Sequence, residues 1–330
     1  MPRRLVLLGS DEIALPAFAA ARALPDTEVV AVYSQPDRPA GRGQEVRPNP
    51  VAAWARAEGL NLLQPEKLDA ADAAHLVSLQ ADLGVVMAYG QLLKDDFLAA
   101  TRLGFVNFHG SLLPALRGAT PVEGALALGL AETGVSMQQV VRKLDAGPIH
   151  AAAKTATRAG EGRAALRARL GVIAGELAAQ ALPPVLSGAS VAVPQDETKV
   201  TYARRLARTD APLDFRQPAV VLRQRILAVE GWPGSTFEHR AAVIKVGAAS
   251  AEDATPSATP GTIVAADRAG VKVACGSGVL VLTQLQRPGG KMLPAAEFLA
   301  GYPLAVGEVL ASAEMPAFVA DRPFPRVPKA

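Results

Sequence analysis

Residues 105–121 read FVNFHGSLLPALRGATP and place the pair Asn107 and His109 at a predicted strand end. Strand side chains alternate with a period of two, so this amide and this imidazole point to the same face. Gly110 permits a tight turn directly after the pair, and Arg117 is a cation within the Pro- and Gly-rich segment that follows. Such a convergence is typical of an active site laid over an open α/β sheet. The alternative is a histidine satisfied inside the core.

The flanking sequence alternates between strand and helix patterns, which predicts an α/β fold with a doubly wound, mostly parallel sheet. Only Gly9 follows the first strand, and without G-x-G-x-x-G a dinucleotide site is not supported. Asp145 lies in a Gly/Pro turn, where it either caps the turn or approaches His109 from a neighbouring strand. Strands are predicted over 4–9, 29–34, 60–63, 83–90, 104–108 and 132–140, and helices over 11–24, 51–59, 70–80, 92–100, 120–129 and 164–181.

Length and composition narrow the class of protein. A chain of 330 residues, half of them hydrophobic, favours two domains. No run of about eighteen uncharged apolar residues occurs and no signal peptide is recognisable, so we expect a cytoplasmic protein. The single Cys275 excludes an internal disulfide and a cysteine-rich zinc site. We expect no metal, because the four histidines (His75, His109, His150 and His239) lack metal-ligand spacing.

The net charge of +3 is unevenly distributed along the chain. Residues 1–198 carry 18 Lys and Arg against 20 Asp and Glu, whereas residues 199–330 carry 16 against 11, a net charge of +5. This imbalance indicates a polyanionic partner held partly by the C-terminal part. A basic cluster at the start of that part is a candidate for phosphate contacts, although such a cluster can also be an ordinary solvated face; it comprises Lys199, Arg204, Arg205 and Arg208.

The segment 35–43 reads QPDRPAGRG and includes Arg38 and Arg42. Its prolines and glycines predict an irregular, cationic loop at the C-terminal end of the second strand. Because α/β sites form at such ends, a ligand-contacting lid and a solvated surface loop both stay open.

Several of these motifs together resemble the methionyl-tRNA formyltransferase family, in order and spacing. They are the loop at 35–43, AYG at 88–90, NFHGSLLP at 107–114, RGATP at 117–121, ETGV at 132–135 and LDAG at 144–147. Later, QDET at 195–198 and TYA at 201–203 resemble the interdomain linker of that family. The trio of Asn107, His109 and Asp145 resembles what formyltransferases that use 10-formyltetrahydrofolate share.

The resemblance implies roles for these residues. Asn107, His109 and Asp145 would be catalytic, and the formyl donor 10-formyltetrahydrofolate would be a co-substrate. The acceptor would be methionyl initiator tRNA, contacted by Arg38, Arg42, Lys199, Arg204, Arg205 and Arg208. The folate pocket would include Tyr89, Ser111, Leu112, Leu113 and Pro114.

The resemblance also implies a domain organisation, with a catalytic domain over 1–188, a linker over 189–208 and an OB-like, tRNA-binding β-barrel over 209–330. Short strands predicted at 242–246, 261–265, 271–275 and 279–285 agree with such a barrel. A helix is predicted over 220–228 and a flexible loop over 248–260. We expect a monomer.

The sequence departs from the family pattern in three places. Ser10 and Asp11 replace a usual Thr-Pro, Leu116 replaces a frequent aromatic residue, and Arg205 replaces a usual lysine. The first two departures border the implied folate pocket. The alternatives to consider are a formyltransferase acting on a sugar-nucleotide amine or other small amine, a hydrolase of formyl-folate, and a non-catalytic RNA-binding protein.

Overall fold

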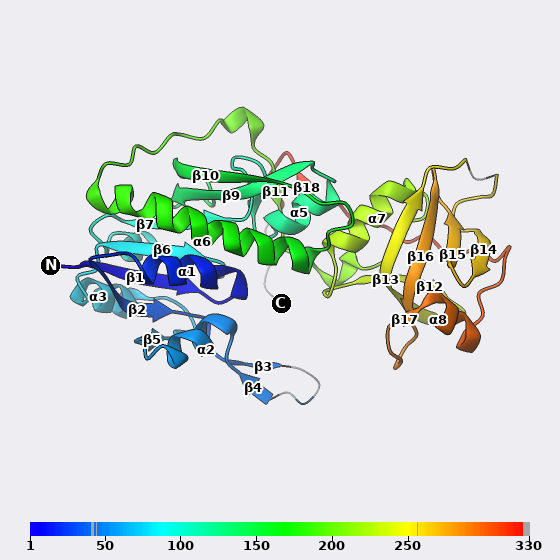
Figure 1. The fold of residues 1–330 in the computed structure, drawn as a ribbon, viewed down its shortest axis with the longest axis horizontal. Coiled ribbons are helices and arrows are strands. Elements are labelled where there is room, and N and C mark those ends of the chain that lie inside the picture. Colours follow the sequence, from blue (N-terminus) through cyan, green and yellow to red (C-terminus); the bar gives the residue numbers. More distant parts are fainter. Residues whose placement is uncertain (41–42, 44, 256, 326–330) are drawn as a thin grey trace. The chain divides into compact units, whose positions relative to one another are not determined.

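A computed structural model describes residues 1–40, 43, 45–255 and 257–325 (Figure 1). Arg42 lies outside the described residues. The chain divides into two compact units, one formed by residues 1–121, 132–156 and 166–202 and the other by residues 122–131, 157–165 and 203–330. The predicted α/β class with a second, β-rich domain is confirmed.

The first unit contains a seven-stranded sheet in the order β10-β9-β7-β6-β1-β2-β5 (Figure 1). The five strands from β5 to β7 in this order pair in parallel, and β9 and β10 pair antiparallel to their neighbours. The strands are β1 (Arg3–Gly9), β2 (Thr27–Tyr33), β5 (Leu62–Leu63), β6 (Leu83–Met87), β7 (Phe105–His109), β9 (Glu132–Gln139) and β10 (Ile149–Ala156).

Strand β1 is buried on both faces, which explains its continuous apolar sequence. Leu5 and Leu7 alternate with Val6 and Leu8, and all four side chains are inaccessible to solvent. Val6 and Leu8 pack in a core cluster with side chains of α3 (Ala70–Ser78) and α4 (Asp95–Leu98). The other helices that begin in the first unit are α1 (Leu15–Arg22), α2 (Pro50–Ala57) and α5 (Pro121–Ala127).

The long helix α6 (Arg163–Ser187) packs closely on the segment around α1 (Figure 1). A β-carbon at Gly171 would lie 3.1 Å from the carbonyl oxygen of Ile13, and one at Gly175 would lie 3.0 Å from that of Pro16. These two glycines lie four residues apart, on one face of the helix, so they allow the backbones to approach. Helix α6 is also long and apolar enough to cross a membrane by length and composition, but half of its apolar window is buried inside the protein.

Two predictions in the first unit are wrong, and one strand was not predicted. The segment 35–43 is not wholly irregular, because its residues 38–40 form strand β3 (Arg38–Ala40), which pairs antiparallel with β4 (Glu45–Arg47). An isolated two-stranded ribbon leaves its outward N–H groups unpaired, so it tolerates Pro39. The helix predicted over 92–100 is the single turn α4. Strand β10 was not predicted, because it is only half-buried and its many alanines lack a strand signature.

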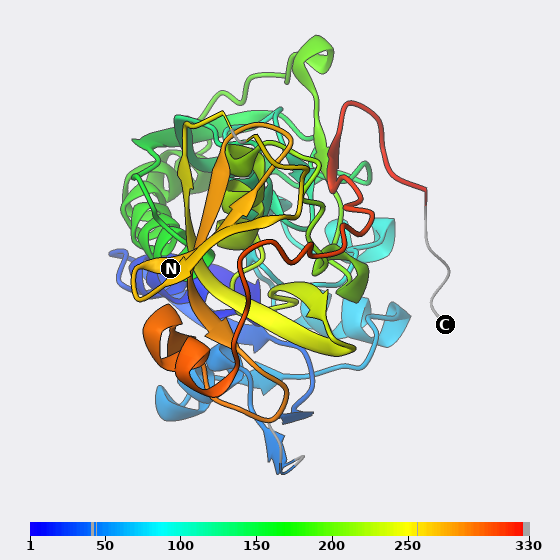
Figure 2. The same ribbon diagram turned by 90° about the vertical axis from the view of Figure 1, so that its right-hand side faces the viewer.

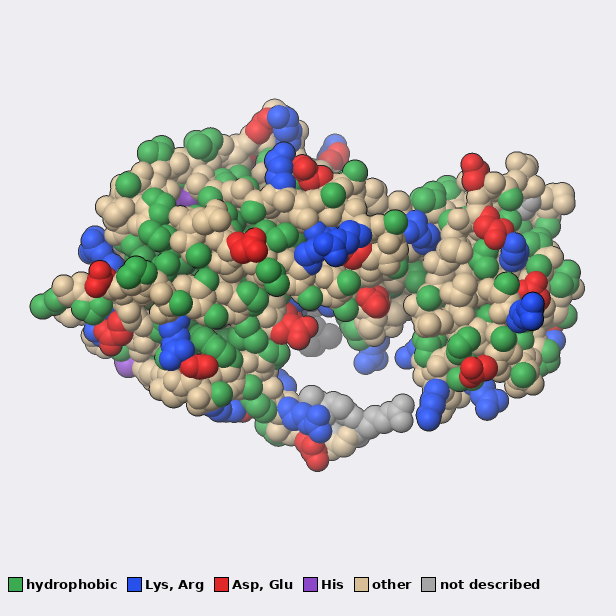
Figure 3. All heavy atoms as spheres, in the orientation of Figure 1, with side chains coloured by type: hydrophobic (Ala, Val, Ile, Leu, Met, Phe, Trp, Pro, Cys, Tyr) green, Lys and Arg blue, Asp and Glu red, His purple; other side chains and the backbone are tan. Residues whose placement is uncertain are grey.

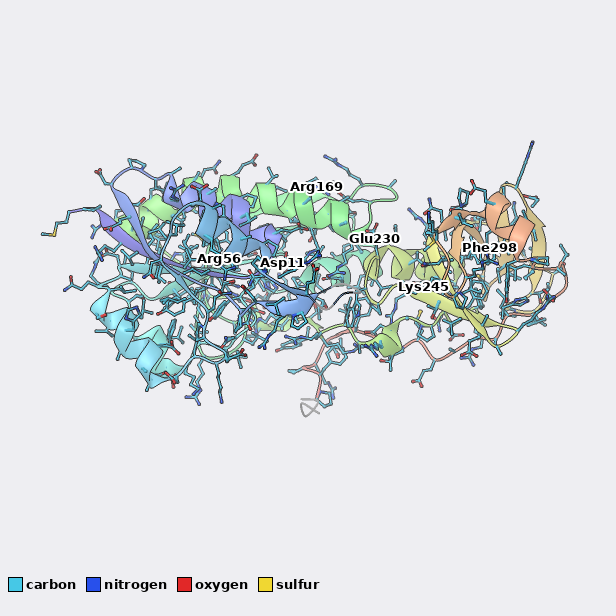
Figure 4. The ribbon with its side chains drawn as sticks, turned by 90° about the horizontal axis from the view of Figure 1, so that it is seen from below. Asp11, Arg56, Arg169, Glu230, Lys245 and Phe298 are labelled. Atoms are coloured by element: carbon cyan, nitrogen blue, oxygen red, sulfur yellow. The ribbon has the colours of Figure 1, made fainter. Side chains whose placement is uncertain are left out.

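The second unit is built on antiparallel strands in the order β12-β13-β16-β15-β14, with β17 paired to β16 (Figure 2). Its core includes Phe215, Ile244 and Phe298, the last of which lies inside the unit in Figure 4. The elements are α7 (Ala219–Ala228), β12 (Ser235–His239), β13 (Ala242–Glu252), β14 (Ile263–Asp267), β15 (Gly270–Ala274), β16 (Val279–Gln286), β17 (Leu293–Pro294) and α8 (Ala295–Gly301).

The loop predicted over 248–260 is partly wrong, because β13 continues to Glu252 and pairs there with Val279 of β16. Cross-strand pairing outweighs the low strand propensity of the alanines and serines in this segment. Strand β12 and helix α8 were not predicted. The remaining strands of the described residues are β8 (Arg117–Gly118), β11 (Tyr202–Ala203) and β18 (Val319–Ala320).

Candidate active site

The site lies where strands β7 and β9 pair. In this antiparallel ladder Asn107 is opposite Gln138, and His109 is opposite Ser136. Directly opposed residues share one face of a sheet, so all four side chains point the same way. The face that Asn107 and His109 were predicted to share therefore also carries Gln138 and Ser136 of the neighbouring strand. The side-chain amide of Asn107 makes no hydrogen bond to any residue that the structure describes.

The His109 imidazole is buried, with 6% of its surface exposed. Its Nε2 lies 2.8 Å from the carbonyl oxygen of Leu116. A carbonyl oxygen only accepts hydrogen bonds, so Nε2 carries the proton in the neutral ring and Nδ1 keeps its lone pair. Nδ1 lies 3.8 Å from Oδ2 of Asp145, a separation too long for a direct hydrogen bond.

Asp145 arrives from the turn that follows β9. Its Oδ2 accepts a hydrogen bond from the backbone N–H of Gly118 at 2.8 Å, and its Oδ1 accepts one from Nε2 of Gln138 at 3.1 Å. The two donors fix the direction of the carboxylate beside His109. Gly147 closes the turn, because a β-carbon there would lie 1.7 Å from the carbonyl oxygen of Gln139.

The loop predicted to form the folate wall is held by buried serines. Ser111 Oγ donates to the carbonyl of Ala115 at 2.7 Å. Ser136 Oγ donates to the carbonyl of Ser111 at 2.8 Å and accepts the N–H of Leu113 at 3.0 Å. Leu112 and Pro114 are half-buried and Leu113 is buried. This loop therefore lies directly against the strand that faces His109.

The ring of Tyr89 lies elsewhere, in the core cluster that contains Tyr33 and Phe97. Burial, followed by the charge of Asp72, raises the pKa of Tyr89. Its hydroxyl has no hydrogen-bond partner within the described part of the chain. Only its backbone carbonyl reaches the sheet end, where it accepts the Nε2 amide of Gln35 at 3.1 Å.

The predicted cationic residues divide into two kinds. Arg204 is largely buried and pairs with Asp210, with nitrogen–oxygen distances of 2.6 and 2.9 Å. Arg205 and Arg208 are exposed, and neither forms an ion pair with any residue the structure describes. The remaining two are exposed but paired, Lys199 with Asp196 at 3.1 Å and Arg38 with Glu66.

Sequence reasoning missed the groups that surround Asp145. Arg117 was noted only as a cation in a loop, yet its side chain is fully buried and pairs with Glu197 at 2.7 Å. Hydrogen bonds from Arg117 and then Lys143 lower the pKa of Glu197 to about 2. Gln195 hydrogen-bonds the same guanidinium. The motif at 195–198 marked these positions, but only as part of a linker.

No group of three or more His, Cys, Asp or Glu side chains suited to a metal ion occurs among the described residues.

Comparisons with known proteins identify the family of the chain. Residues 5–182 match the family model described as formyl transferase, and residues 205–303 match the formyl transferase, C-terminal domain. The methionyl-tRNA formyltransferase of Paraburkholderia phytofirmans is 41% identical, covering 92% of this chain and 96% of its own. That of Halorhodospira halophila is 40% identical, covering 93% and 99%.

Solved structures with low sequence identity share the fold alone. An N-formyltransferase from Helicobacter canadensis, in complex with folinic acid and dTDP-3-aminofucose, has a TM-score of 0.65 at 12% identity, covering 86% of this chain and 99% of its own. HypX from Aquifex aeolicus, in complex with tetrahydrofolic acid, has a TM-score of 0.61 at 16% identity, covering 94% and 51%. Given the full-length relatives at about 40% identity and the two matching domains, the chain belongs to the methionyl-tRNA formyltransferase family.

Proposed function

We propose that the chain transfers the formyl group of 10-formyltetrahydrofolate to the α-amino group of methionine esterified to initiator tRNA. The family supports this reaction, and one geometric observation supports the chemistry. His109 donates its Nε2–H to the Leu116 carbonyl and turns Nδ1 towards Asp145, beside the Asn107 amide. Acyl transfer needs a base, here His109, and a carboxylate that stabilises the protonated base, here Asp145. It also needs a neutral hydrogen-bond donor for the oxyanion, here Asn107.

In this mechanism the amine attacks the formyl carbon, and the carbonyl electron pair moves onto oxygen. The side-chain N–H of Asn107 donates to that oxyanion, an interaction it is free to make because it has no partner in the described part of the chain. The Nδ1 of His109 takes the proton lost by the amine. Asp145, 3.8 Å from that nitrogen, stabilises the imidazolium.

The intermediate then collapses. The bond between the formyl carbon and the folate nitrogen breaks, its electron pair goes to that nitrogen, and His109 returns the proton there. The products are the formamide and tetrahydrofolate, and His109 is again neutral. No covalent bond to the enzyme forms. General acid–base transfer of this kind contributes about 10²- to 10⁴-fold to a rate.

The folate is proposed to lie against the loop from Ser111 to Pro114, whose half-buried Leu112 and Pro114 offer apolar surface next to the reacting groups. For Tyr89, the proposal is a contribution through its backbone at the end of β6, since its ring packs in the core. Folate compounds bound in the two structural neighbours agree with a folate donor.

The tRNA is proposed to contact exposed cations in the C-terminal part, which carries the net charge of +5. Arg205 and Arg208 have no acidic partner among the described residues, so both are available to phosphates. Lys245 pairs across the sheet with Gln286, next to the turn that carries Arg287 and Lys291, and all three cations are exposed. Figure 3 shows Lys and Arg side chains, with some Asp and Glu, on the face of the second unit turned to the viewer, and Figure 4 labels Lys245.

Arg38, Arg42 and Lys199 are proposed to reach the acceptor end of the tRNA, and Arg204 to hold Arg205 in place. The division into 1–188, 189–208 and 209–330, a monomeric state and a cytoplasmic location are also proposals.

The decisive experiment compares acceptors. Purified protein is given 10-formyltetrahydrofolate with charged initiator tRNA, charged elongator tRNA or a sugar-nucleotide amine, and N-formyl product is quantified by mass spectrometry. We expect formylation of the initiator methionyl-tRNA alone. Preferential formylation of the sugar-nucleotide amine, or release of formate without an acceptor, would overturn the proposal.

A further inference from the structure

The segment from Gln195 to Thr201 lies over the candidate site, although its motifs mark it only as a linker. Just before it, the N–H and carbonyl groups of Ile149 and Val193 form two hydrogen bonds of 2.8 Å, which dock this part of the chain beside β10. The following residues then make side-chain and backbone contacts to both sides of the pair His109 and Asp145.

Gln195 joins the Asp145 turn to the loop that follows β7. Its Oε1 accepts two hydrogen bonds from the buried Arg117 guanidinium, at 2.8 and 3.1 Å. Its Nε2 donates to the carbonyls of Asp145 and Gly147, at 2.9 and 2.7 Å. Because a guanidinium only donates and a carbonyl only accepts, only one orientation of the amide satisfies all four contacts.

Thr201 holds the other side of the site. Its Oγ1 accepts the N–H of Leu116 at 2.9 Å, and its carbonyl accepts the N–H of Arg117 at 2.8 Å. The carbonyl of Leu116 is the group that receives Nε2–H of His109. Thr201 therefore sets the position of the acceptor that fixes the tautomer of the histidine.

Both residues held by this segment have an unfavourable backbone conformation. Leu116 has a φ of 60° and Asp145 a φ of 50°, in the left-handed region that residues with a β-carbon rarely adopt. Such conformations persist only where surrounding contacts impose them, and they cluster at functional sites. Here the contacts come from Thr201 on Leu116 and from Gln195 on Asp145.

We propose that residues 195–201 form a positioning strap for formyl transfer, in which Gln195 and Thr201 set the distance and orientation between His109 and Asp145. The inference rests on the proposed function. Neither residue touches the reacting atoms in the proposed mechanism, so both are positioning residues. A displacement of about 1 Å in such a pair is enough to lower a rate by about 10²-fold.

The first test uses full-length Thr201→Val, which keeps the shape and removes the hydroxyl acceptor, and Thr201→Ser, which restores it. Thr209→Val, at an exposed threonine with no hydrogen bond to a described side chain, is the matched control. We expect Thr201→Val to lower kcat by about 10- to 10²-fold with little change in KM for the folate donor. Thr201→Ser should restore most of the rate.

Two further readouts separate positioning from a general loss of structure. The pH dependence of kcat should shift in Thr201→Val, because the tautomer and surroundings of His109 change. The ¹⁵N chemical shifts of the His109 ring, assigned with His109→Gln, should move towards a mixture of tautomers. If the valine variant does not fold, the same measurements on Gln195→Glu, with exposed Gln180→Glu as its control, decide the question.

The proposal that residues 195–201 position His109 and Asp145 would be wrong if a folded Thr201→Val or Gln195→Glu protein had wild-type kcat and an unchanged pH profile. A rate loss that Thr201→Ser does not reverse would also overturn it. Failure of the proposed function looks different, because the unaltered protein would then not formylate methionyl-tRNA at all.

Discussion

Each unit of the molecule buries a cluster of charged and polar side chains, and the two clusters differ in how fully their hydrogen bonds are used. In the second unit, Asp210 has no exposed surface. Its oxygens accept hydrogen bonds from Arg204, Arg225 and the N–H of Ala207. The Arg225 guanidinium also lies 4.5 Å from the centre of the Phe318 ring. Both carboxylate oxygens of Asp210 thus have hydrogen-bond donors within the described part of the chain.

In the first unit, His109 is also buried and the Asp145 side chain is only 9% exposed, but the hydrogen bonds of this pair are only partly satisfied. The two side chains stop 3.8 Å apart, and the neighbouring Asn107 amide has no partner among the described residues. Burial and charge are common to both clusters, so neither property marks the site. Unused hydrogen-bonding capacity, held in place by satisfied neighbours, distinguishes the candidate active site from the structural cluster.

The largest expected effect tests the unsatisfied cluster. His109→Ala removes the proton carrier, so formylation of methionyl-tRNA should fall by about 10²- to 10⁴-fold while the urea midpoint changes little. Asp145→Asn should lower the rate as well, since it removes the charge that stabilises the imidazolium. The control is His75→Ala, on the exposed side of α3. Near-normal turnover in His109→Ala would show that the cluster of His109 and Asp145 is not the active site.

Substitutions in the cluster of Asp210, Arg204 and Arg225 should lower the stability of the protein and leave its activity unchanged. Asp210→Ala leaves the buried Arg225 and the half-buried Arg204 without their acid and should lower the free energy of unfolding by about 3–5 kcal/mol, measured by urea denaturation. Asp253→Ala, at an exposed carboxylate, is the control. The folded fraction of Asp210→Ala should keep its formylation rate. A large rate loss without a stability loss would mean that this cluster, too, is functional.

Substitutions of the neighbours Arg204 and Arg205 should have different effects, one on stability and the other on tRNA binding. Arg204→Ala breaks the pair with Asp210 and should mainly lower stability. Arg205→Ala should leave stability unchanged, raise KM for tRNA and reduce the salt dependence of binding by a slope of about 0.9, because one phosphate contact is lost. Arg268→Ala, at an exposed turn, serves as a charge-matched control. Equal stability losses in both variants would contradict this assignment.

The smallest effect is a pH dependence of stability. Burial acts to raise the pKa of Asp210, but hydrogen bonds from Arg204 and Ala207 outweigh it, and the pKa is lowered overall. A lowered pKa in the folded state gives stability that is complete above the unfolded value of about 4 and is lost as pH falls below it. The stability difference between wild type and Asp210→Asn should therefore shrink below about pH 4. If the stability difference between wild type and Asp210→Asn grew at acid pH, the lowered pKa of Asp210 would be contradicted.

The sequence predicted most of the parallel sheet, because buried strands and amphipathic helices are local patterns. It also predicted that Asn107 and His109 share a face, since that follows from the period of a strand. It did not predict β10 or the hairpin of β3 and β4, whose strands are short, half-buried or rich in alanine and proline. Those elements depend on pairing with partners that the local sequence does not specify.

What the sequence by itself determined is therefore the type of fold and the family, both of which follow from local patterns and motif spacing. The catalytic roles of Asn107, His109 and Asp145 follow from the resemblance to that family and stay predictions. Only the tertiary structure decided which groups complete the site and which cations are free. The N–H of Gly118 is 27 residues from Asp145, Gln195 is 78 from Arg117 and Thr201 is 85 from Leu116. Arg204 and Arg205 are neighbours of the same type, yet only Arg204 is paired with the buried Asp210. Contacts over such distances arise from packing of the whole chain, and no local period encodes them.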